Sequence, residues 1–257
     1  MNVTTLTPSQ LKLAIVRNPL VVNPNVTVTD AISQMTNERS RCNVYVGCNP
    51  IDEQHTEWRS SCVLVVEDGQ VIGILTERDI IHLSAKYVSL DHLIIRDVMT
   101  SSVVTLREAN FTDLLQTINL LQQHHIHHLP VVNDQNCVVG LITHESLRQI
   151  FSPVNLLRLR IVADVMTQDV ICAAPTSSML RIAKLLSKNN VSCVIIVEPI
   201  VLQDNPSEQQ LQRPVGLVTE RDLVQFQGLG LSLENCTAAS VMSTPVFEIA
   251  LDDLLLS

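Results

Sequence analysis

The chain has 257 residues, 46% of them hydrophobic, which is enough for one large domain or two medium ones with packed cores and argues against disorder. Its formal net charge of -9 at pH 7 argues against nucleic acid or an anionic membrane as a partner, so a small anionic ligand would need a locally basic pocket. An odd count of seven cysteines, several of them in apolar runs, and no apolar run near the roughly 18 residues that span a bilayer predict a reduced, cytoplasmic protein without a membrane segment.

The first elements expected along the chain are a lead-in helix within residues 1–16 and then a β-hairpin. Val63–Val66 and Val71–Leu75 are apolar runs of strand length, and the Asp68-Gly69 pair between them is a turn signal. A polar stretch at about residues 43–60 lies before the hairpin. We expect this stretch to be a surface loop, because insertions are tolerated best where few contacts depend on them.

The next helix is predicted in the middle of the chain from the spacing of its apolar residues. They recur every three or four positions, which is the pattern of one apolar helical face. These residues are Phe111, Leu114, Leu115, Ile118 and Leu121. The His-His-Leu-Pro-Val-Val run that follows is predicted to be a strand. Further helices should open at Thr76, Thr143 and Thr219, so that the chain reads strand, helix, strand, strand, helix.

Two sequence markers indicate that this order of elements repeats. The first is Asp-Val-Met-Thr at 97–100 and 164–167, with Ser-Val-Met-Ser at 240–243. The second is a glycine, two apolar residues and a threonine, beginning at Gly73, Gly140 and Gly216. Both markers advance by 67 residues to the second copy and by 76 to the third, as the distances from Gly73 to Gly140 to Gly216 show. A shared spacing of this kind indicates tandem repeats.

The repeats divide the chain into predicted domains. They are a lead-in helix at 1–16 and four repeats at 17–92, 93–156, 157–230 and 231–257. The third repeat contains a second loop insertion at about 199–213. Each repeat buries little surface alone, so we expect neighbours to pair through their sheets. The fourth repeat is cut short, so we interpret the chain as a fragment of a longer protein.

This order of elements, with an Asp-Val-Met-Thr head, a His-His-Leu-Pro-Val-Val strand and the Gly-Leu-Val-Thr-Glu-Arg-Asp sequence at 216–222, resembles the cystathionine-β-synthase (CBS) domain over nearly the whole chain. The resemblance implies an α/β (α+β) fold of tandem CBS repeats, each a small three-stranded sheet packed by two helices and paired into Bateman modules. It also implies a regulatory, ligand-sensing module that binds AMP, ADP, ATP or S-adenosylmethionine in clefts between paired repeats.

The family's ribose motif is a glycine, an apolar residue, any residue, serine or threonine, two further residues and an aspartate. It matches the chain twice, at Gly73, Thr76 and Asp79 and at Gly216, Thr219 and Asp222. An ionised carboxylate has only acceptor sites, so it can take hydrogen bonds from both ribose hydroxyls. The same spacing also forms a helix capping box, and that alternative stays open. In the second repeat Ser146 replaces the aspartate, so we expect Thr143 to be only a cap and that cleft to be empty or weak.

The resemblance assigns the ligand's phosphate to basic side chains. His127 and His128 precede the Leu-Pro step, while Arg78 and Arg221 lie between the threonine and aspartate of the two motifs. The alternatives are a solvated helix-to-strand corner for the histidines and an exposed first helical turn for the arginines. A metal site that includes His124 is a third interpretation. We expect no metal, because the following proline forces extended backbone and no Cys, Asp or Glu lies close in sequence.

The adenine pocket is expected to be lined by five apolar residues, for which a plain core role is an equal alternative. They are Leu20, Val21, Val63, Val170 and Ile171. Cys62 and Cys193 are interpreted as standing where the family has Leu-Pro, so the strand entry there departs from the family pattern.

The sequence contains no Gly-x-x-x-x-Gly-Lys, Cys-x-x-Cys or His-Glu-x-x-His pattern, so we expect no enzyme activity and no cofactor other than a regulatory adenosine nucleotide. The competing interpretation is an interaction or dimerisation scaffold that binds no ligand. The resemblance further implies an effector domain C-terminal to these repeats in a longer chain, of the histidine kinase or diguanylate cyclase type used in two-component and related cyanobacterial-like signalling. A homo-oligomer is a further expected partner state.

Overall fold

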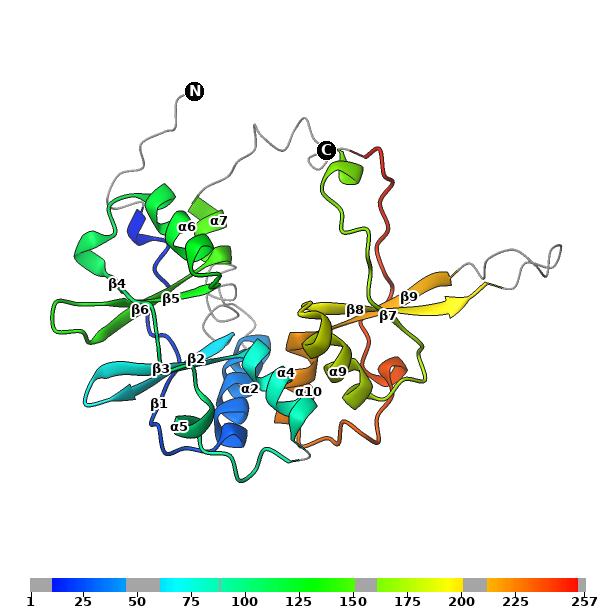
Figure 1. Cartoon of the computed structure of the whole chain (residues 1–257), viewed down its shortest axis with the longest axis horizontal. Helices are drawn as coiled ribbons and strands as arrows, with labels where there is room; N and C mark the ends of the chain where they lie inside the picture. Colours follow the sequence, from blue (N-terminus) through cyan, green and yellow to red (C-terminus); the bar gives the residue numbers. More distant parts are fainter. Residues whose placement is uncertain (1–10, 45–60, 88, 151–160, 201–211, 254–257) are drawn as a thin grey trace. The chain divides into compact units, whose positions relative to one another are not determined.

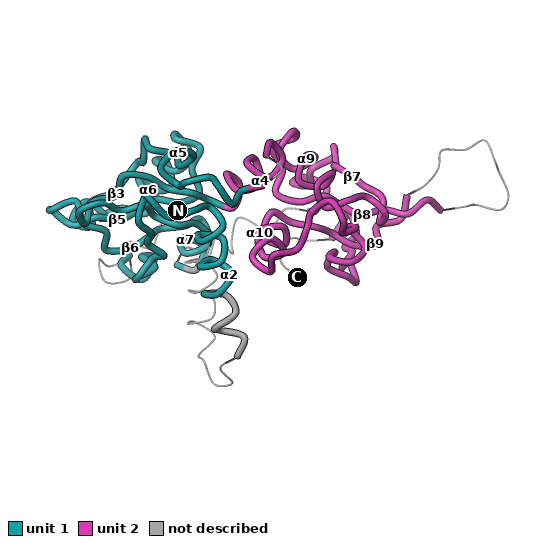
Figure 2. Tube along the Cα trace, turned by 90° about the horizontal axis from the view of Figure 1, so that it is seen from below, with its two compact units in different colours: residues 1–76, 90–152 teal, residues 77–89, 153–257 magenta. Residues whose placement is uncertain are grey.

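The computed structural model describes residues 11–44, 61–87, 89–150, 161–200 and 212–253. Contacts along the chain divide the protein into two compact units (Figure 2). Unit 1 comprises residues 1–76 and 90–152, and unit 2 comprises residues 77–89 and 153–257. Most of the two predicted loop insertions, and residues 1–10 of the predicted lead-in helix, lie outside the described residues.

The first sheet of unit 1 has the order β1-β2-β3 and consists of β1 (Val21–Val22), β2 (Cys62–Glu67) and β3 (Gln70–Thr76). β1 pairs in parallel with β2, because α2 (Val28–Val44) carries the chain from one to the other. β2 and β3 are antiparallel. Their turn has Asp68 at φ 50° and Gly69 at φ 80°, the left-handed pair of a tight hairpin, which confirms the predicted turn.

The second sheet of unit 1 repeats this order. It consists of β4 (Leu106–Arg107), β5 (His128–Val132) and β6 (Val138–Thr143), and its helices are α5 (Ile95–Val98), η1 (Glu108–Asn110), α6 (Leu114–Gln123) and α7 (His144–Ile150). The predicted helical stripe is partly wrong. The Asp113 side chain accepts a hydrogen bond from the Leu115 N–H, so α6 begins at Leu114 and leaves Phe111 before it. Leu115 is 47% exposed and so lies off the buried face.

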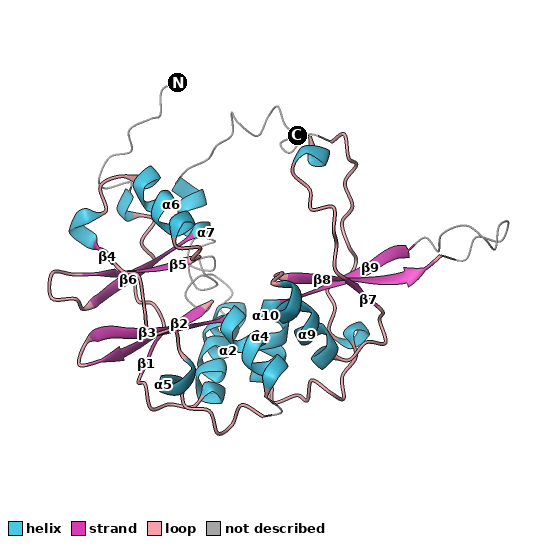
Figure 3. Cartoon of the chain, viewed as in Figure 1, coloured by secondary structure: helices cyan, strands magenta, loops and turns pink. Residues whose placement is uncertain are grey.

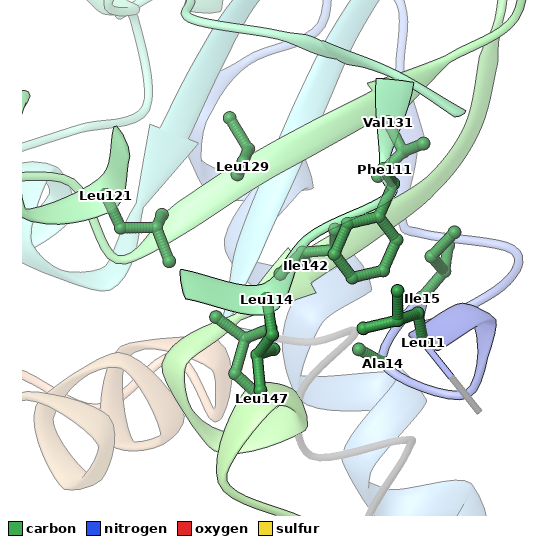
Figure 4. Close-up of a cluster of buried hydrophobic side chains, with 10 residues drawn as sticks. All are labelled: Leu11, Ala14, Ile15, Phe111, Leu114, Leu121, Leu129, Val131, Ile142 and Leu147. Carbon is green, nitrogen blue, oxygen red and sulfur yellow. The ribbon is translucent and has the colours of Figure 1, made fainter. Parts of the chain in front are cut away.

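A buried cluster joins this second sheet to the start of the described chain (Figure 4). Its members come from the segment before β1, from Phe111 and α6, from β5 and β6, and from α7. They are Leu11, Ala14, Ile15, Phe111, Leu114, Leu121, Leu129, Val131, Ile142 and Leu147. The lead-in segment therefore packs on the second repeat, although the first repeat follows it in sequence.

In each sheet, a segment from outside the repeat forms a β-bridge to the third strand, next to the marker glycine. Thr100 bridges Ile74, Val16 bridges Leu141, and Ser243 bridges Leu217. The residue before each bridging residue lies against the glycine: Met99 on Gly73, Ile15 on Gly140 and Met242 on Gly216. A side chain on the glycine would collide with this neighbour, which explains why the marker contains glycine.

Unit 2 contains the third sheet and also the helix that the sequence predicted to open at Thr76 in the first repeat. The sheet consists of β7 (Cys172–Ala173), β8 (Cys193–Pro199) and β9 (Gln212–Thr219), in that order, with helices η2 (Val162–Asp164), α9 (Met179–Asn189), α10 (Glu220–Gly228) and η3 (Ala238–Ser240). The helix α4 (Glu77–Lys86) directly follows β3 in sequence but packs against α9 and α10 (Figures 1 and 3). Its buried residues are Ile80, Ile81 and Ser84. The described chain thus confirms the predicted mixed α/β repeats with small three-stranded sheets.

Candidate functional site

The Thr-x-x-Asp motif of the third repeat joins the end of β9 to the start of α10. Thr219 is the N-cap, and its Oγ1 accepts a hydrogen bond of 3.2 Å from the Asp222 N–H. The Asp222 carboxylate accepts two bonds through Oδ2, at 2.8 Å from the Thr219 N–H and 2.7 Å from its hydroxyl. The capping box left open by the sequence is therefore present. Since both bonds use Oδ2, Oδ1 keeps its acceptor sites for another donor.

The same motif in the first repeat lies where the two units divide. Thr76 ends β3 and belongs to unit 1, whereas Asp79 lies in the first turn of α4 and belongs to unit 2. Thr76 is paired across the hairpin with Cys62. α4 therefore begins directly after the motif threonine, as α10 does.

The second repeat has the cap without the carboxylate, as predicted. Thr143 and Ser146 are buried, with 0% and 1% of their surfaces exposed. The Thr143 hydroxyl accepts from the Ser146 N–H at 3.1 Å, and the Ser146 hydroxyl accepts from the Thr143 N–H at 3.0 Å and donates to the Thr143 carbonyl at 3.1 Å. The Ser146 hydroxyl therefore takes part in capping the N-terminus of α7.

The strand register corrects the interpretation of the two cysteines. Cys62, His128 and Cys193 each face the motif threonine of their repeat, at Thr76, Thr143 and Thr219. The cysteines therefore occupy the position of His128 and not that of Leu129-Pro130. The shift arises because the length of the hairpin loop differs between repeats, which alters the register counted back from the glycine.

One of the two predicted phosphate histidines, His128, contacts the residue that precedes β2 of the first sheet. His128 Nε2 is 2.8 Å from the Ser61 hydroxyl, and Ser61 directly precedes β2. His128 from the second repeat thus lies beside Cys62, which faces Thr76 in the first repeat. His127 is exposed and its ring centroid is 5.0 Å from that of His144.

The alternative of a metal site that includes His124 and His128 has no support in the local geometry. α6 ends at Gln123, His124 is its C-cap and His125 takes the left-handed conformation at φ 52°. His124 and His128 therefore do not share a helical face. In the described part of the chain, no three His, Cys, Asp or Glu side chains are placed to hold a metal ion.

The two predicted phosphate arginines form ion pairs in unit 2. Arg78 Nε is 3.2 Å from Glu220 Oε1, and Arg221 Nε is 3.9 Å from Glu77 Oε1. The arginine side chains are 36% and 43% exposed, and those of the glutamates only 13% and 14%. Burial raises the pKa of the Glu220 carboxyl above its usual value, although Arg78 opposes that rise. Glu77 and Glu220 were not among the predicted site residues; their signal in the sequence is that Thr-Glu-Arg-Asp occurs unchanged in both repeats.

The five predicted adenine-pocket residues differ in exposure. Val63 is fully buried in β2, in line with the alternative of a core role. Val21 and Val170 are 43% and 52% exposed. The carbonyls of Leu20 and Ile171 each accept a hydrogen bond from the second strand of their sheet, which makes these two residues equivalent. Val21 then corresponds to Cys172, one residue beyond the predicted pair.

Comparison with known proteins identifies the family of the chain. The CBS domain model matches residues 12–86, 95–152 and 162–228. Homoserine O-acetyltransferase of Methanococcoides burtonii is 27% identical over 139 residues, and inosine-5'-monophosphate dehydrogenase of Methanocaldococcus jannaschii is 32% identical over 136 residues. These alignments cover 54% and 52% of this chain but 25% and 23% of the enzymes, so the chain spans about a quarter of each relative.

The fold of most of the chain also has a solved counterpart. The crystal structure of protein MJ1225 from Methanocaldococcus jannaschii, proposed as an archaeal homologue of g-AMPK, matches with a TM-score of 0.65 at 18% identity. The match covers 92% of this chain and 82% of that one. Among the described residues, the chain has no helix with the length and apolar character to cross a bilayer. With most of its residues matched by the family model, the chain belongs to the CBS-domain family, whose domains are generally regulatory and not catalytic.

Proposed function

We propose that this chain is a regulatory module that senses an adenosine nucleotide. Thr219 and Asp222 hold the ribose in the third repeat, and Thr76 and Asp79 do so in the first. The observation that carries the proposal is the state of the Asp222 carboxylate. Two hydrogen bonds to Oδ2 fix its position, while Oδ1 keeps acceptor sites for the two vicinal hydroxyls of a ribose.

The second repeat supports this assignment by contrast. The Ser146 hydroxyl is hydrogen-bonded to the backbone of Thr143, and serine has no charged acceptor. Capping alone is thus achieved in this protein by Thr-x-x-Ser, so capping does not require the aspartates of the other two repeats. We propose that the second repeat binds no ribose through this motif.

The other parts of the ligand follow from residues near the motifs. Arg78 and Arg221 supply positive charge for a phosphate, and His127 and His128 are proposed to contact the same group. For the adenine we retain the exposed or partly exposed Leu20, Val21, Val170 and Ile171, together with Val63. The nucleotide acts as a regulatory ligand, and this function needs no other cofactor.

Regulation follows if ligand binding favours one arrangement of the repeats, which an effector then distinguishes from the other. Family membership supports a regulatory role of this kind. We propose an effector in the same longer chain or in a partner, and a histidine kinase or diguanylate cyclase stays the specific prediction. The same proposal includes a cytoplasmic location and a homo-oligomer. It also includes the repeat limits 17–92, 93–156, 157–230 and 231–257.

The test replaces the carboxylate while keeping the cap. Asp222→Ser and Asp79→Ser convert each motif into the Thr-x-x-Ser cap of the second repeat. Asp113→Ser makes the same chemical change at an N-cap outside the motifs. Isothermal titration with AMP, ADP, ATP, S-adenosylmethionine and adenosine should show each motif variant losing one class of site. The lost affinity should be about tenfold or more for the ligands that bind, because they share the ribose and lose a charged partner.

Wild-type affinity at both classes of site in Asp79→Ser/Asp222→Ser would contradict the ribose assignment. The competing function is an interaction scaffold, which the fully formed capping box and the exposed apolar residues Phe247, Ile249 and Leu251 favour. A thermal-shift series with millimolar nucleotides separates the two. A specific ligand at a hundredfold excess over its dissociation constant stabilises the folded state by about 2.7 kcal/mol, whereas a scaffold shows no shift with any of them.

A further inference from the structure

The ion pairs of unit 2 are reciprocal between two copies of the same motif. Glu77 and Arg78 of α4 stand 143 residues before Glu220 and Arg221 of α10, the same interval as between Gly73 and Gly216. Each arginine pairs with the glutamate of the other copy. A third contact has the same interval, because Ser84 and Gln227 are also equivalent residues, and Gln227 Nε2 donates a hydrogen bond of 3.0 Å to the Ser84 hydroxyl.

These contacts show that α4 and α10 pack about a local pseudo-two-fold axis. In such an interface residue i contacts j while the equivalent of j contacts the equivalent of i. The axis passes near Ser84 and Gln227, and the four charges lie together at the N-terminal turns of the two helices. The second repeat does not carry the Glu-Arg residues on which these ion pairs depend, since α7 begins with His144-Glu145.

The two glutamate side chains are more deeply buried than the two arginine side chains. The glutamates are largely covered, while more than a third of each arginine side chain is open to solvent. A covered carboxylate that keeps its charge depends on its cation, and Arg78 is the partner that lowers the pKa of Glu220 against the effect of burial. The arginines are therefore both the exposed charges that a ligand phosphate can reach and the charges that neutralise the glutamates.

We propose that Glu77 and Glu220 are built-in competitors of the ligand phosphate, each holding the arginine of the opposite motif until a nucleotide displaces it. This inference rests on the proposed nucleotide function and specifies how the site is regulated. It makes the glutamates determinants of affinity that discriminate by charge. They weaken the binding of AMP and ATP, which must take an arginine from a carboxylate, and leave adenosine unaffected.

Coupling between the two motifs follows from the same arrangement. When a phosphate takes Arg221, Glu77 loses the arginine with which it pairs, and its negative charge, which also acts on Glu220, is no longer offset by that arginine. Arg78 is then held more strongly, and a phosphate at the first motif binds more weakly. Adenosine brings no phosphate, so its two binding events should show no such effect.

The test compares Glu220→Gln, Glu77→Gln and the double variant with wild type, in the full chain, by isothermal titration with AMP, ATP and adenosine. Glutamine keeps the shape and removes the charge. AMP and ATP should bind about threefold to tenfold more tightly to the variants, in the range of a partly exposed ion pair, with adenosine unchanged. Glu67→Gln is the matched control, since Glu67 pairs with Arg96 within unit 1 and lies at the turn of the β2–β3 hairpin, at the opposite end from Thr76.

The outcomes separate this inference from the function on which it rests. Wild-type binding of AMP combined with unchanged or weaker AMP binding in both single variants overturns the competitor role alone. Equal tightening of adenosine and AMP also overturns it, because the effect would not depend on the phosphate. If wild type and all variants bind none of the three probes, the nucleotide function is contradicted and the competitor role is rejected with it.

Discussion

The contact between a marker glycine and a methionine makes a quantitative prediction about Gly73→Ala. An alanine Cβ at this position would overlap Met99, coming within 2.8 Å of its Cγ and 3.1 Å of its Cε as well as against its sulfur. The three nearest atoms all belong to that one flexible side chain. Gly73 does not have a left-handed φ, so alanine adds no backbone strain there.

Two opposing effects set the size of the change. Overpacking a filled site costs about 1–3 kcal/mol, whereas alanine at a compatible backbone position gains about 0.4–1 kcal/mol by restricting the unfolded chain. Gly73→Ala should therefore destabilise the protein by roughly 0–2.5 kcal/mol. In the presence of Met99→Ala the obstruction is gone, and Gly73→Ala should instead stabilise by about 0.4–1 kcal/mol. The sign of the effect thus depends on Met99.

Gly140→Ala is the matched control for this rescue. Its nearest atoms are Ile15 Cγ2 and, at 3.0 Å, the backbone carbonyl oxygen of Val16. Ile15→Ala removes the first obstacle but not the second. Since a carbonyl in a bridge to Leu141 cannot rotate away, Gly140→Ala should stay destabilising in both backgrounds.

The measurement is urea denaturation of the full chain followed by circular dichroism, with hydrogen exchange of β3 and β6 to assign the effect to the correct sheet. The double-mutant cycle of Gly73→Ala with Met99→Ala should give a coupling energy of about 1–3 kcal/mol. An equal cost of Gly73→Ala with and without Met99→Ala would refute the argument that the methionine selects the glycine. Rescue of Gly140→Ala by Ile15→Ala as complete as that of Gly73→Ala would refute the distinction between the two sites.

Two further predictions concern the core and the covered carboxylate. Leu121→Ala should lower the free energy of unfolding by about 2–5 kcal/mol, because Leu121 is fully buried. Leu115→Ala on the same helix should lower it by less than about 0.5 kcal/mol, because Leu115 is 47% exposed. Equal losses in urea denaturation would contradict the assigned face of α6. Burial raises the pKa of Glu220, so its contribution to stability is fully present below the usual value of 4.5 and is lost as pH rises through the raised pKa. The stability of Glu220→Gln relative to wild type should therefore increase between about pH 4 and pH 7, and a difference that stays flat or falls in thermal unfolding across this range would show that Arg78 fully compensates the burial.

Local features of the fold could be predicted from the sequence because they depend on neighbouring residues. Asp68-Gly69 adopts the left-handed turn that its residue types favour, and Thr219 caps the helix that it precedes. The spacing of the two markers predicted the repeats without any structure. The start of α6 was harder to predict, because Phe111 continues the apolar spacing although the Asp113 cap excludes it from the helix.

The tertiary structure alone decided which repeats share their surfaces. The sequence places α4 at the end of the first repeat, yet its buried face lies on α9 and α10, about a hundred residues or more further along the chain. No periodicity encodes that choice, because an apolar helical face fits any complementary partner. The same holds for the ion pairs. Two copies of Thr-Glu-Arg-Asp predicted two ribose motifs. Only the packing of α4 against α10 brings Glu77 and Glu220 to the arginines of the opposite copy. A pairing between residues so far apart in sequence depends on the fold that brings them together.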